Sequence, residues 1–289
     1  MPELPEVETI RRGLSKFILN KKFVQVEVLC EKSWVGERVT GTVVSLRRYG
    51  KALIIDLNTG KSLMIHLRMT GQLIWRGAEQ YAAGHPSENF VAELPNKQTR
   101  VVFKFEDGVL YFNDQRKFGF IKVLLTSEVE NDAFIKKLAK EPWQMNVKEL
   151  YDKFQHHKNA PVKAVLLDQT IICGLGNIYA DEALFDAGVH PETRAGALDE
   201  KQVEAILMGA RKVMQESIDS GGSTMATYVR ADGTRGDYLE KFAKVFRREE
   251  ENCVRCGTKI VKIRVAGRGT HICPKCQKVN DDQNFLRRE

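Results

Sequence analysis

Apolar residues near the start of the chain recur at helical spacing. The positions that fall on one face of such a helix are Val7, Ile10, Leu14, Phe17 and Ile18. Pro5 suits the first turn of a helix, and Glu6 and Glu8 place negative charge where the helix dipole favours it. The pattern therefore predicts an amphipathic helix from Pro5 to about Lys21.

Between residues 23 and 125 the spacing changes to alternation of apolar and polar residues, which is typical of half-buried strands. Glycine, asparagine and aspartate separate the alternating stretches. The predicted strands are 24–28, 51–57, 62–69, 100–105, 109–112 and 120–125. Several short strands at this spacing favour an antiparallel β-sandwich or barrel. The stretch 77–96 contains two prolines and predicts a long loop across one edge.

Beyond residue 128 the apolar spacing becomes helical again. The predicted helices are 132–140, 146–157, 161–169, 178–187 and 199–219. A polar, glycine-containing stretch follows at 220–237, then a two-stranded module with four of the six cysteines at about 245–280. The fold class is therefore α+β. We expect an N-terminal helix and β-sandwich domain at 1–130, a helical domain at 131–240, and a hairpin module with a charged tail at 241–289.

The composition indicates what kind of partner the protein binds and in which compartment it works. The net charge of +7 favours a polyanionic partner, either nucleic acid or an anionic membrane surface. No stretch reaches about 18 uncharged apolar residues, so no membrane-spanning helix is predicted. The acidic, proline-containing start does not resemble a signal peptide. We therefore expect a protein of the reducing cytoplasm, where cysteines bind metals or pack rather than form disulfides.

Four cysteines form two CxxC pairs at metal-binding spacing. The pairs are Cys253 with Cys256, and Cys273 with Cys276. Four thiolates at this spacing can surround one tetrahedral Zn²⁺ ion, although a redox-active dithiol would also use a CxxC pair. Because four protein ligands leave no open position for water, we expect one structural zinc ion.

A short turn between the cysteine pairs carries an arginine flanked by glycines, Gly267-Arg268-Gly269. Strand-like alternation precedes this turn, so the segment predicts a β-hairpin with Arg268 at its tip. The flanking glycines permit close approach to a phosphate or to the minor groove of DNA. An ordinary exposed turn arginine would give the same pattern.

The segment Gly174-Leu175-Gly176-Asn177 lies between two predicted helices. Asn177 can cap the helix that starts at Ile178, and the glycines leave backbone N–H groups available to bind a phosphate. Lys163 on the preceding helix favours this phosphate-binding interpretation. An ordinary capped turn is the alternative.

The N-terminus offers a possible nucleophile. Initiator Met is normally removed before a small residue such as Pro2, and its removal exposes a secondary amine. Because an α-amine has a pKa near 8, roughly a tenth of it is unprotonated at neutral pH. Such an amine can attack a sugar carbon and form a charged iminium, while Glu3 and Glu6 could move protons. A simple lead-in to the first helix would have the same residues.

Together these segments resemble a known family. Residues 2–9, Pro-Glu-Leu-Pro-Glu-Val-Glu-Thr, match the opening of bacterial formamidopyrimidine-DNA glycosylases almost letter for letter. Further segments similar to that family's motifs follow in order: 48–51, 66–71, 114–119, the helix–two-turn–helix segment 174–182, and the cysteine hairpin. The resemblance runs from Pro2 to about Lys278.

The resemblance implies a bifunctional enzyme of base excision repair. It would excise oxidised purines, such as 8-oxoguanine and formamidopyrimidines, and then cleave the strand by β,δ-elimination. Pro2 would be the nucleophile at the sugar C1′, and Glu3 the general acid. Glu6 would support this site, and Lys51 would meet a phosphate beside the damaged nucleotide. The partner would be double-stranded DNA with oxidised bases or abasic sites, bound by a monomer.

The resemblance also implies a set of residues that bind DNA. Those expected to hold backbone phosphates are His66, Asn177 and Arg268. Lys163 is expected to bind DNA because of its position beside the Gly174–Asn177 turn, as described above. Those expected to enter the duplex are Met69, Arg116 and Phe118. The polar stretch 220–237 resembles the family's lid over the flipped base. A methionine and a flat phenylalanine can replace lost base stacking, and arginine can hydrogen-bond the orphaned cytosine. Met69 and Phe118 could instead belong to the core, as most apolar strand residues do.

Two other interpretations remain open. An endonuclease VIII-like glycosylase would prefer oxidised pyrimidines, although its members usually begin Pro-Glu-Gly-Pro. A non-catalytic zinc-finger protein could grip DNA while Pro2 stays masked behind Met1. The chain also departs from the family pattern at residues 97–100, Lys-Gln-Thr-Arg, and at residues 245–249, Val-Phe-Arg-Arg-Glu.

Overall fold

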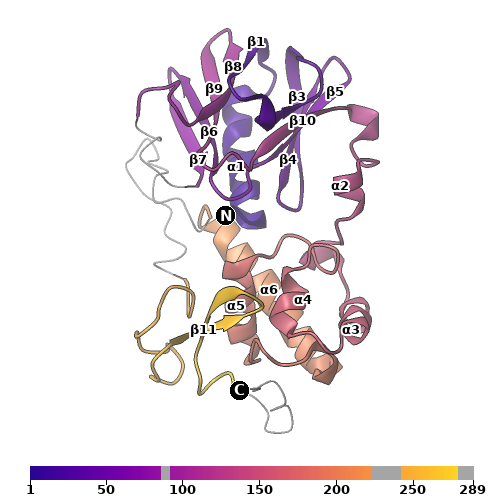
Figure 1. Cartoon of the computed structure of the whole chain (residues 1–289), viewed down its shortest axis with the longest axis vertical. Helices are drawn as coiled ribbons and strands as arrows, with labels where there is room; N and C mark the ends of the chain where they lie inside the picture. Colours follow the sequence, from indigo (N-terminus) through magenta and orange to yellow (C-terminus); the bar gives the residue numbers. More distant parts are fainter. Residues whose placement is uncertain (86–91, 223–241, 279–289) are drawn as a thin grey trace. The chain divides into compact units, whose positions relative to one another are not determined.

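The computed structural model describes residues 1–85, 92–222 and 242–278 (Figure 1). Most of the stretch 220–237 and the charged tail lie outside these ranges. The chain forms two compact units, Met1–Lys136 with Ser217–Tyr238, and Lys137–Glu216 with Leu239–Glu289. The hairpin module, which the sequence analysis separated at residue 241, thus shares a unit with the helical segment.

The first unit begins with helix α1 (Leu4–Ile18), which confirms the predicted N-terminal helix. Leu4, Val7, Ile10 and Leu14 are each at most 1% exposed, and α1 packs them against the strands. Each buried aliphatic side chain of this kind contributes about 1.5–3 kcal/mol relative to exposure. Burial of one helix face therefore holds the start of the chain against the sheet.

Ten strands make up the rest of the first unit (Figure 1). They are β1 (Lys22–Val28), β2 (Trp34–Val35), β3 (Gly41–Tyr49), β4 (Ala52–Leu57), β5 (Lys61–His66), β6 (Gly71–Gly77), β7 (Gln80–Gly84), β8 (Thr99–Phe105), β9 (Gly108–Asp114) and β10 (Phe120–Leu125). The short helix α2 (Ala133–Lys136) follows them, in place of the longer helix predicted at 132–140.

The strands hydrogen-bond in the order β2-β10-β5-β4-β3-β1-β8-β9-β6-β7. All pairs are antiparallel except β10 with β2. The two ends of this order share one apolar core, which contains Trp34 of β2 and Tyr81 of β7. The ring of Trp34 also lies 6.1 Å from that of Phe103 in β8. The sheet thus folds over itself around β1, and the predicted antiparallel sandwich is confirmed.

Four of the ten strands were not predicted: the short β2, which pairs with β10, the strand β6, which pairs with β9, and the two strands described next, β3 and β7. β3 contains Arg47, Arg48 and Tyr49, whose polar atoms interrupt the alternation expected of a strand. β7 lies inside the segment 77–96, which was predicted to be a loop. Its short run Tyr-Ala-Ala-Gly lacks the alternation of apolar and polar residues that marks a half-buried strand. Both strands form through pairing with neighbours, β3 with β4 and β7 with β6.

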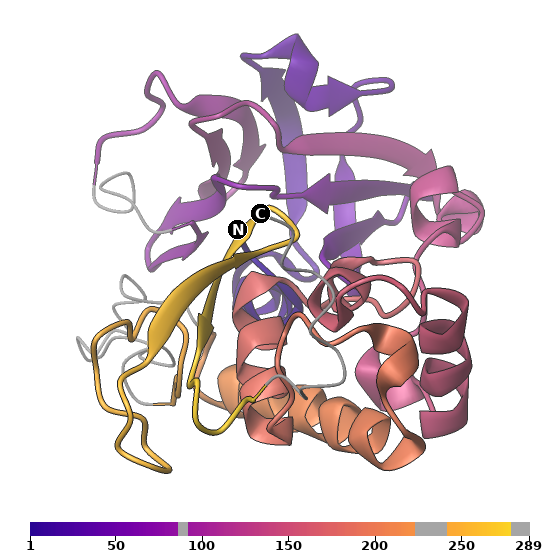
Figure 2. The same cartoon turned by 60° about the horizontal axis from the view of Figure 1, so that its bottom comes forward.

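The second unit consists of helices and a two-stranded hairpin. The helices are α3 (Val147–His156), α4 (Val162–Leu167), α5 (Asn177–Ala187) and α6 (Glu200–Asp219), the last of which runs on into the first unit. The hairpin consists of β11 (Val261–Val265) and β12 (Arg268–Ile272), paired side by side (Figure 2). Strand β12 packs against α5. Helices, sandwich and zinc hairpin therefore agree with the predicted fold class.

Candidate active site

The chain start is held against the first turn of α1. The backbone N–H of Glu3 donates to the Glu6 carboxylate at 2.8 Å, and the Glu3 carbonyl accepts from the Val7 N–H at 3.1 Å. Pro2, Glu3 and Glu6 are all buried. The structure thus brings three of the four predicted catalytic residues together in one segment, whose backbone is fixed by the helix.

The fourth predicted catalytic residue, Lys51, lies in the turn between β3 and β4, and its side chain is buried. Arg48 supports this turn. Its guanidinium donates to the Gly50 carbonyl at 3.0 Å and pairs with Glu8 of α1 at 3.2 Å. Arg48 therefore ties the turn that carries Lys51 to the helix that follows Pro2.

Glu8 forms the centre of a cluster of arginines on α1. Its carboxylate pairs with Arg11 at 2.8 Å and with Arg12 at 2.7 Å, in addition to Arg48. Burial raises the pKa of Glu8, but the hydrogen bonds from Arg11 and Arg12 outweigh it and lower the pKa to about 2. Glu8 is therefore ionised at neutral pH and pairs with Arg48 as a carboxylate.

His66, at the end of β5, is 5% exposed and lies against the rings of Phe120 and Phe134. Burial lowers its pKa, and the charges of Arg68 and Lys51 add to the effect, giving a pKa of about 3. The ring nitrogen Nδ1 accepts the Arg68 N–H at 3.0 Å. The neutral ring therefore carries its proton on Nε2, which is the nitrogen able to donate to a phosphate.

The three residues predicted to enter the duplex lie on two turns outside the core. Phe118 is 55% exposed, Arg116 is exposed and Met69 is half-buried. The Arg116 guanidinium lies over the Phe118 ring, 4.8 Å from its centroid. Phe118 in particular is not a core residue, and all three side chains belong to turns that connect strands.

The polar stretch 220–237 enters the described structure only at its start. Gly222 has φ +92°, and a Cβ on it would lie 3.6 Å from the Glu6 Cα and from the Thr9 hydroxyl. The backbone therefore passes close to the first turn of α1 before residue 223. The remainder of the stretch, which the sequence analysis interpreted as a lid over the flipped base, lies outside the described residues.

In the second unit, Arg268 and Asn177 are brought together. Arg268 is exposed at the start of β12, next to Gly267 with φ +75°. The Asn177 amide donates to the Gly269 carbonyl at 3.0 Å. Asn177 is the first residue of α5 rather than its predicted cap, because its side chain binds the hairpin backbone instead of the helix N-terminus.

The four predicted cysteine ligands converge. Their sulfur atoms all lie within 4.8 Å of one another, with Cys253 and Cys276 at 3.9 Å and Cys256 and Cys273 at 3.4 Å. Zn–S bonds of about 2.3 Å place tetrahedral thiolates about 3.8 Å apart. Backbone N–H groups also donate to sulfur, as Cys276 does to Cys273 at 3.4 Å. The group therefore fits one tetrahedral zinc ion.

The side chain of Lys163 is enclosed by protein, although the sequence analysis expected it to bind DNA. Its side chain is fully buried, and its ammonium pairs with the Asp181 carboxylate at 2.6 Å and donates to the Thr270 hydroxyl at 2.7 Å. A charge that is enclosed in this way does not face a phosphate. In this structure Lys163 instead joins α4 and α5 to the hairpin.

The comparisons with known proteins agree along the whole chain. Profiles of the formamidopyrimidine-DNA glycosylase N-terminal domain, of its H2TH domain and of the zinc finger found in FPG and IleRS match residues 1–121, 138–229 and 250–279. The curated formamidopyrimidine-DNA glycosylase of Pelotomaculum thermopropionicum is 39% identical over 96% of this chain and 100% of its own length. That of Desulfitobacterium hafniense is 38% identical with the same coverage. The chain belongs to the formamidopyrimidine-DNA glycosylase family.

Solved structures of this glycosylase family show the same fold. The Lactococcus lactis enzyme bound to DNA with an AP site superimposes with a TM-score of 0.82 at 32% identity. Its complex with DNA that contains N7-benzyl-Fapy-dG gives 0.84 at 33% identity. Each comparison covers 96% of this chain and 100% of the other. As a member of the family, the chain is a DNA glycosylase, and its four cysteines hold one structural zinc ion.

The glycosylase contains supporting residues that the sequence analysis did not single out. Asp181 pairs with Lys163 and accepts the His271 N–H at 3.0 Å. Glu182 accepts three consecutive backbone N–H groups, at residues 244–246, between 2.8 and 3.0 Å. Both belong to the motif at 174–182, so two adjacent acids that directly follow an apolar run were the available signal.

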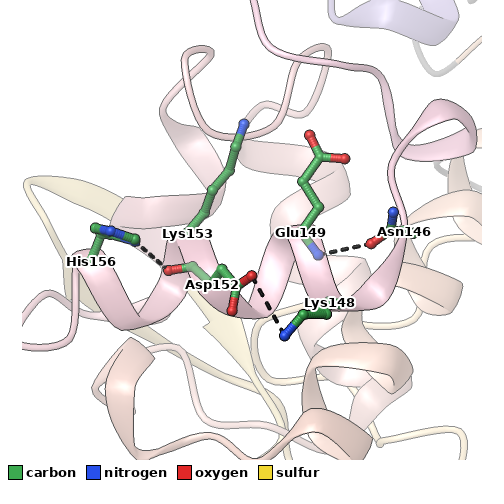
Figure 3. Close-up of a pocket in the computed structure, with 6 residues that line it drawn as sticks. All are labelled: Asn146, Lys148, Glu149, Asp152, Lys153 and His156. Carbon is green, nitrogen blue, oxygen red and sulfur yellow. Dashed lines mark hydrogen bonds and ion pairs between the residues drawn. The ribbon is translucent and has the colours of Figure 1, made fainter.

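A hollow elsewhere on the second unit lies apart from the predicted site residues. A shallow hollow along α3 contains none of the predicted site residues (Figure 3). It is lined by Asn146, Lys148, Glu149, Asp152, Lys153 and His156. Its polar groups pair locally, as His156 does with the Asp152 carbonyl.

Among the residues that the structure describes, no helix has the length and apolar character to span a membrane.

Proposed function

We propose that this glycosylase excises oxidised purines from double-stranded DNA and then cleaves the strand at the resulting abasic site. The observation that carries the proposal is the buried Pro2–Glu3 segment, held by Glu6 at the start of α1. The names of the curated relatives, and the Lactococcus lactis complexes with abasic and Fapy-dG-type DNA, support the same substrate class.

The chemistry follows from the Pro2 amine. Once Met1 is removed, the secondary amine attacks the sugar C1′, and the bond between C1′ and the damaged base breaks. Glu3 donates a proton as the ring opens and the base departs. The product is an iminium that withdraws electrons, so that loss of a C2′ proton expels the 3′ phosphate. Glu6 holds the Glu3 backbone in place, and Lys51 neutralises a neighbouring phosphate.

Binding of DNA uses residues of both units. In our proposal the neutral His66, Asn177 and Arg268 hold backbone phosphates, and Lys163 positions the hairpin instead of contacting DNA. Met69, Arg116 and Phe118 fill the space left by the flipped nucleotide. The exposure of Arg116 and Phe118 on turns supports this role, because a side chain that enters DNA must first be accessible.

The functional segments that we propose keep the boundaries expected from the sequence, which differ from those of the two compact units. We propose a catalytic segment at 1–130, a DNA-binding helical segment at 131–240 that includes the lid at 220–237, and a zinc hairpin at 241–289. We further propose that the enzyme acts as a monomer in the cytoplasm, where its cysteines stay reduced for zinc.

Borohydride trapping on abasic DNA tests the mechanism. We expect mass spectrometry to show a chain that begins at Pro2, and borohydride to reduce the iminium to a stable protein–DNA adduct. A Pro2→Gly variant keeps a terminal amine but loses the secondary amine, so trapping should fall about tenfold or more. Pro5→Ala, which changes a proline in the same segment, should trap normally. A chain that retains Met1 and yields no adduct would support the non-catalytic alternative.

A second candidate substrate is an oxidised pyrimidine. A solved complex of the Lactococcus lactis enzyme, 33% identical to this chain, contains DNA with an oxidised pyrimidine. Single-turnover excision of 8-oxoguanine opposite cytosine and of thymine glycol distinguishes the two. We expect the purine to be removed faster. A strong preference for thymine glycol would overturn the purine assignment while leaving the role of Pro2 intact.

A further inference from the structure

Two turns of the β-sandwich lie side by side at the place where β5 leads into β6 and β9 leads into β10. The first turn, residues 67–70, carries Met69, and the second, residues 115–119, carries Arg116 and Phe118. Strand register aligns both ends of the turns, because His66 pairs with Phe120 and Gly71 pairs with Asp114. The residues proposed to enter DNA therefore come from two adjacent connections of the same sheet.

Asp114 joins these two turns. Its side chain is fully buried, and one carboxylate oxygen accepts the Thr70 hydroxyl and the Arg116 N–H, the latter at 3.2 Å. The other oxygen accepts the Gly119 N–H at 2.7 Å. The Thr70 hydroxyl in turn accepts the Arg116 N–H at 3.0 Å. One carboxylate thus closes the second turn and ties it to the first.

The surrounding backbone leaves the two turns little freedom. A Cβ on Gly119 would lie 2.8 Å from the Phe112 ring and 3.1 Å from the Asp114 carboxylate. A Cβ on Gly71 would lie 2.4 Å from the Leu67 carbonyl oxygen. Close packing of this kind restricts each turn locally. The hydrogen bonds of Asp114 and Thr70 supply the link between the two turns.

We propose that Asp114 and Thr70 form a clasp that keeps Met69, Arg116 and Phe118 at one spacing, so that they enter the duplex as a single unit. The clasp rests on the proposed function, which assigns these three side chains to the DNA. Asp114 and Thr70 are positioning residues. They hold the Arg116 backbone in the conformation from which its guanidinium reaches the orphaned base. This backbone therefore does not have to become ordered each time the enzyme binds DNA.

The consequence is a specific effect on recognition of the orphaned base. Arginine can donate to the adjacent acceptors of cytosine, whereas adenine presents a different pattern. If the Arg116 backbone is released, its guanidinium no longer meets cytosine in one geometry. The ratio of excision rates for 8-oxoguanine opposite cytosine and opposite adenine then falls toward one.

Single-turnover excision by the full-length zinc-loaded enzyme tests the clasp. Thr70→Val removes the hydroxyl at nearly constant volume, and Thr70→Ser is the matched control that keeps it. We expect Thr70→Val to lower the cytosine-to-adenine ratio about tenfold, and Thr70→Ser to preserve the ratio. Asp114→Asn should act like Thr70→Val, because an amide cannot accept at both of the positions where the carboxylate does. A ratio is unaffected by loss of folded protein, so poor folding cannot imitate this result.

A double-mutant comparison separates the clasp from the function on which it rests. In an Arg116→Ala background, Thr70→Val should cause no further loss of the ratio, since the clasp acts through Arg116. If Arg116→Ala lowers the ratio while Thr70→Val and Asp114→Asn leave it unchanged, the clasp is wrong and the assignment of Arg116 stands. If Arg116→Ala itself has no effect, the proposed contact with the orphaned base fails, and the clasp fails with it.

Discussion

The His66 imidazole lies against two phenylalanine rings, where a positive charge is poorly solvated. Its pKa of about 3 keeps the ring neutral at physiological pH, so it can bind a phosphate as a hydrogen-bond donor but not as a cation. Glu8 instead stays negatively charged, because its arginine partners hold its pKa at about 2. His66 and Glu8 thus each keep one charge state near neutral pH.

The lowered pKa of His66 predicts a loss of stability in mild acid. The unfolded chain binds a proton to this histidine below about pH 6.5, while the folded chain does not until about pH 3. Stability therefore falls as pH drops through this window, by about 2 kcal/mol between pH 7.5 and pH 5. Glu8 adds nothing in this interval, because it loses its stabilising charge only below its ordinary pKa of 4.5.

Thermal unfolding of wild type and His66→Gln at pH 7.5 and pH 5 measures this effect. The variant should be less stable at pH 7.5, but its decrease between the two pH values should be smaller than that of wild type by about 2 kcal/mol. All other groups are the same in both proteins, so their contributions cancel in the comparison. Equal decreases would show that His66 is protonated in the folded enzyme.

Helix α5 anchors the zinc hairpin through acidic side chains. Asp181 pairs with Lys163 and binds the backbone of His271, and Glu182 binds three backbone N–H groups that precede the cysteines. Burial raises the pKa of Glu182, although its backbone donors oppose the shift. The orientation of Arg268 is therefore set by α4 and α5 as well as by zinc.

Lys163→Met tests this anchoring. Breaking a buried ion pair leaves Asp181 uncompensated and costs about 3–5 kcal/mol, so the helical unit should unfold at lower temperature and DNA affinity should fall. Zinc content should remain near one per chain, since no cysteine is changed. Lys148→Met is the matched control, because it removes the same charge from a side chain that is 80% exposed. If Lys163→Met weakened DNA binding at unchanged stability, Lys163 would contact phosphate directly.

On the scale of the whole molecule, the net charge of +7 attracts DNA, but the structure shows which of the proposed contacts carry charge. His66 is neutral and Lys163 is enclosed, so Lys51 and Arg268 are the cations left among the proposed phosphate contacts. Only cationic contacts release counterions from DNA. Salt dependence therefore distinguishes the two kinds of phosphate contact.

For two cationic contacts, a plot of the logarithm of DNA affinity against the logarithm of salt concentration should have a slope of about −1.8. The affinity should therefore fall roughly tenfold between 50 and 200 mM salt. Arg268→Gln should reduce the magnitude of this slope by about 0.9, whereas His66→Gln should lower affinity and leave the slope unchanged. Fluorescence anisotropy with abasic DNA over a salt series measures both. A changed slope for His66→Gln would mean that this histidine binds phosphate in its charged form.

The family, the zinc ligands and the amphipathic helix α1 could all be predicted from the sequence, because each depends on residues that are close in the chain. Spacing of apolar residues specifies a helix face, and two CxxC pairs specify a zinc site. The fold class followed from the same local patterns. Strand β7 could not be predicted, because its small residues become a strand only through pairing with β6.

The environments of Lys163, His66 and Asp114 were decided by tertiary structure alone. A lysine that follows a proline on a short helix looks suited to a phosphate, and only the packing of Asp181 and Thr270 around it shows otherwise. Likewise, the charge of His66 depends on rings brought from β10 and α2, and the Asp114 link depends on a threonine 44 residues away. Sequence specifies which chemical groups are present, whereas desolvation and hydrogen bonding between distant segments determine how each group behaves.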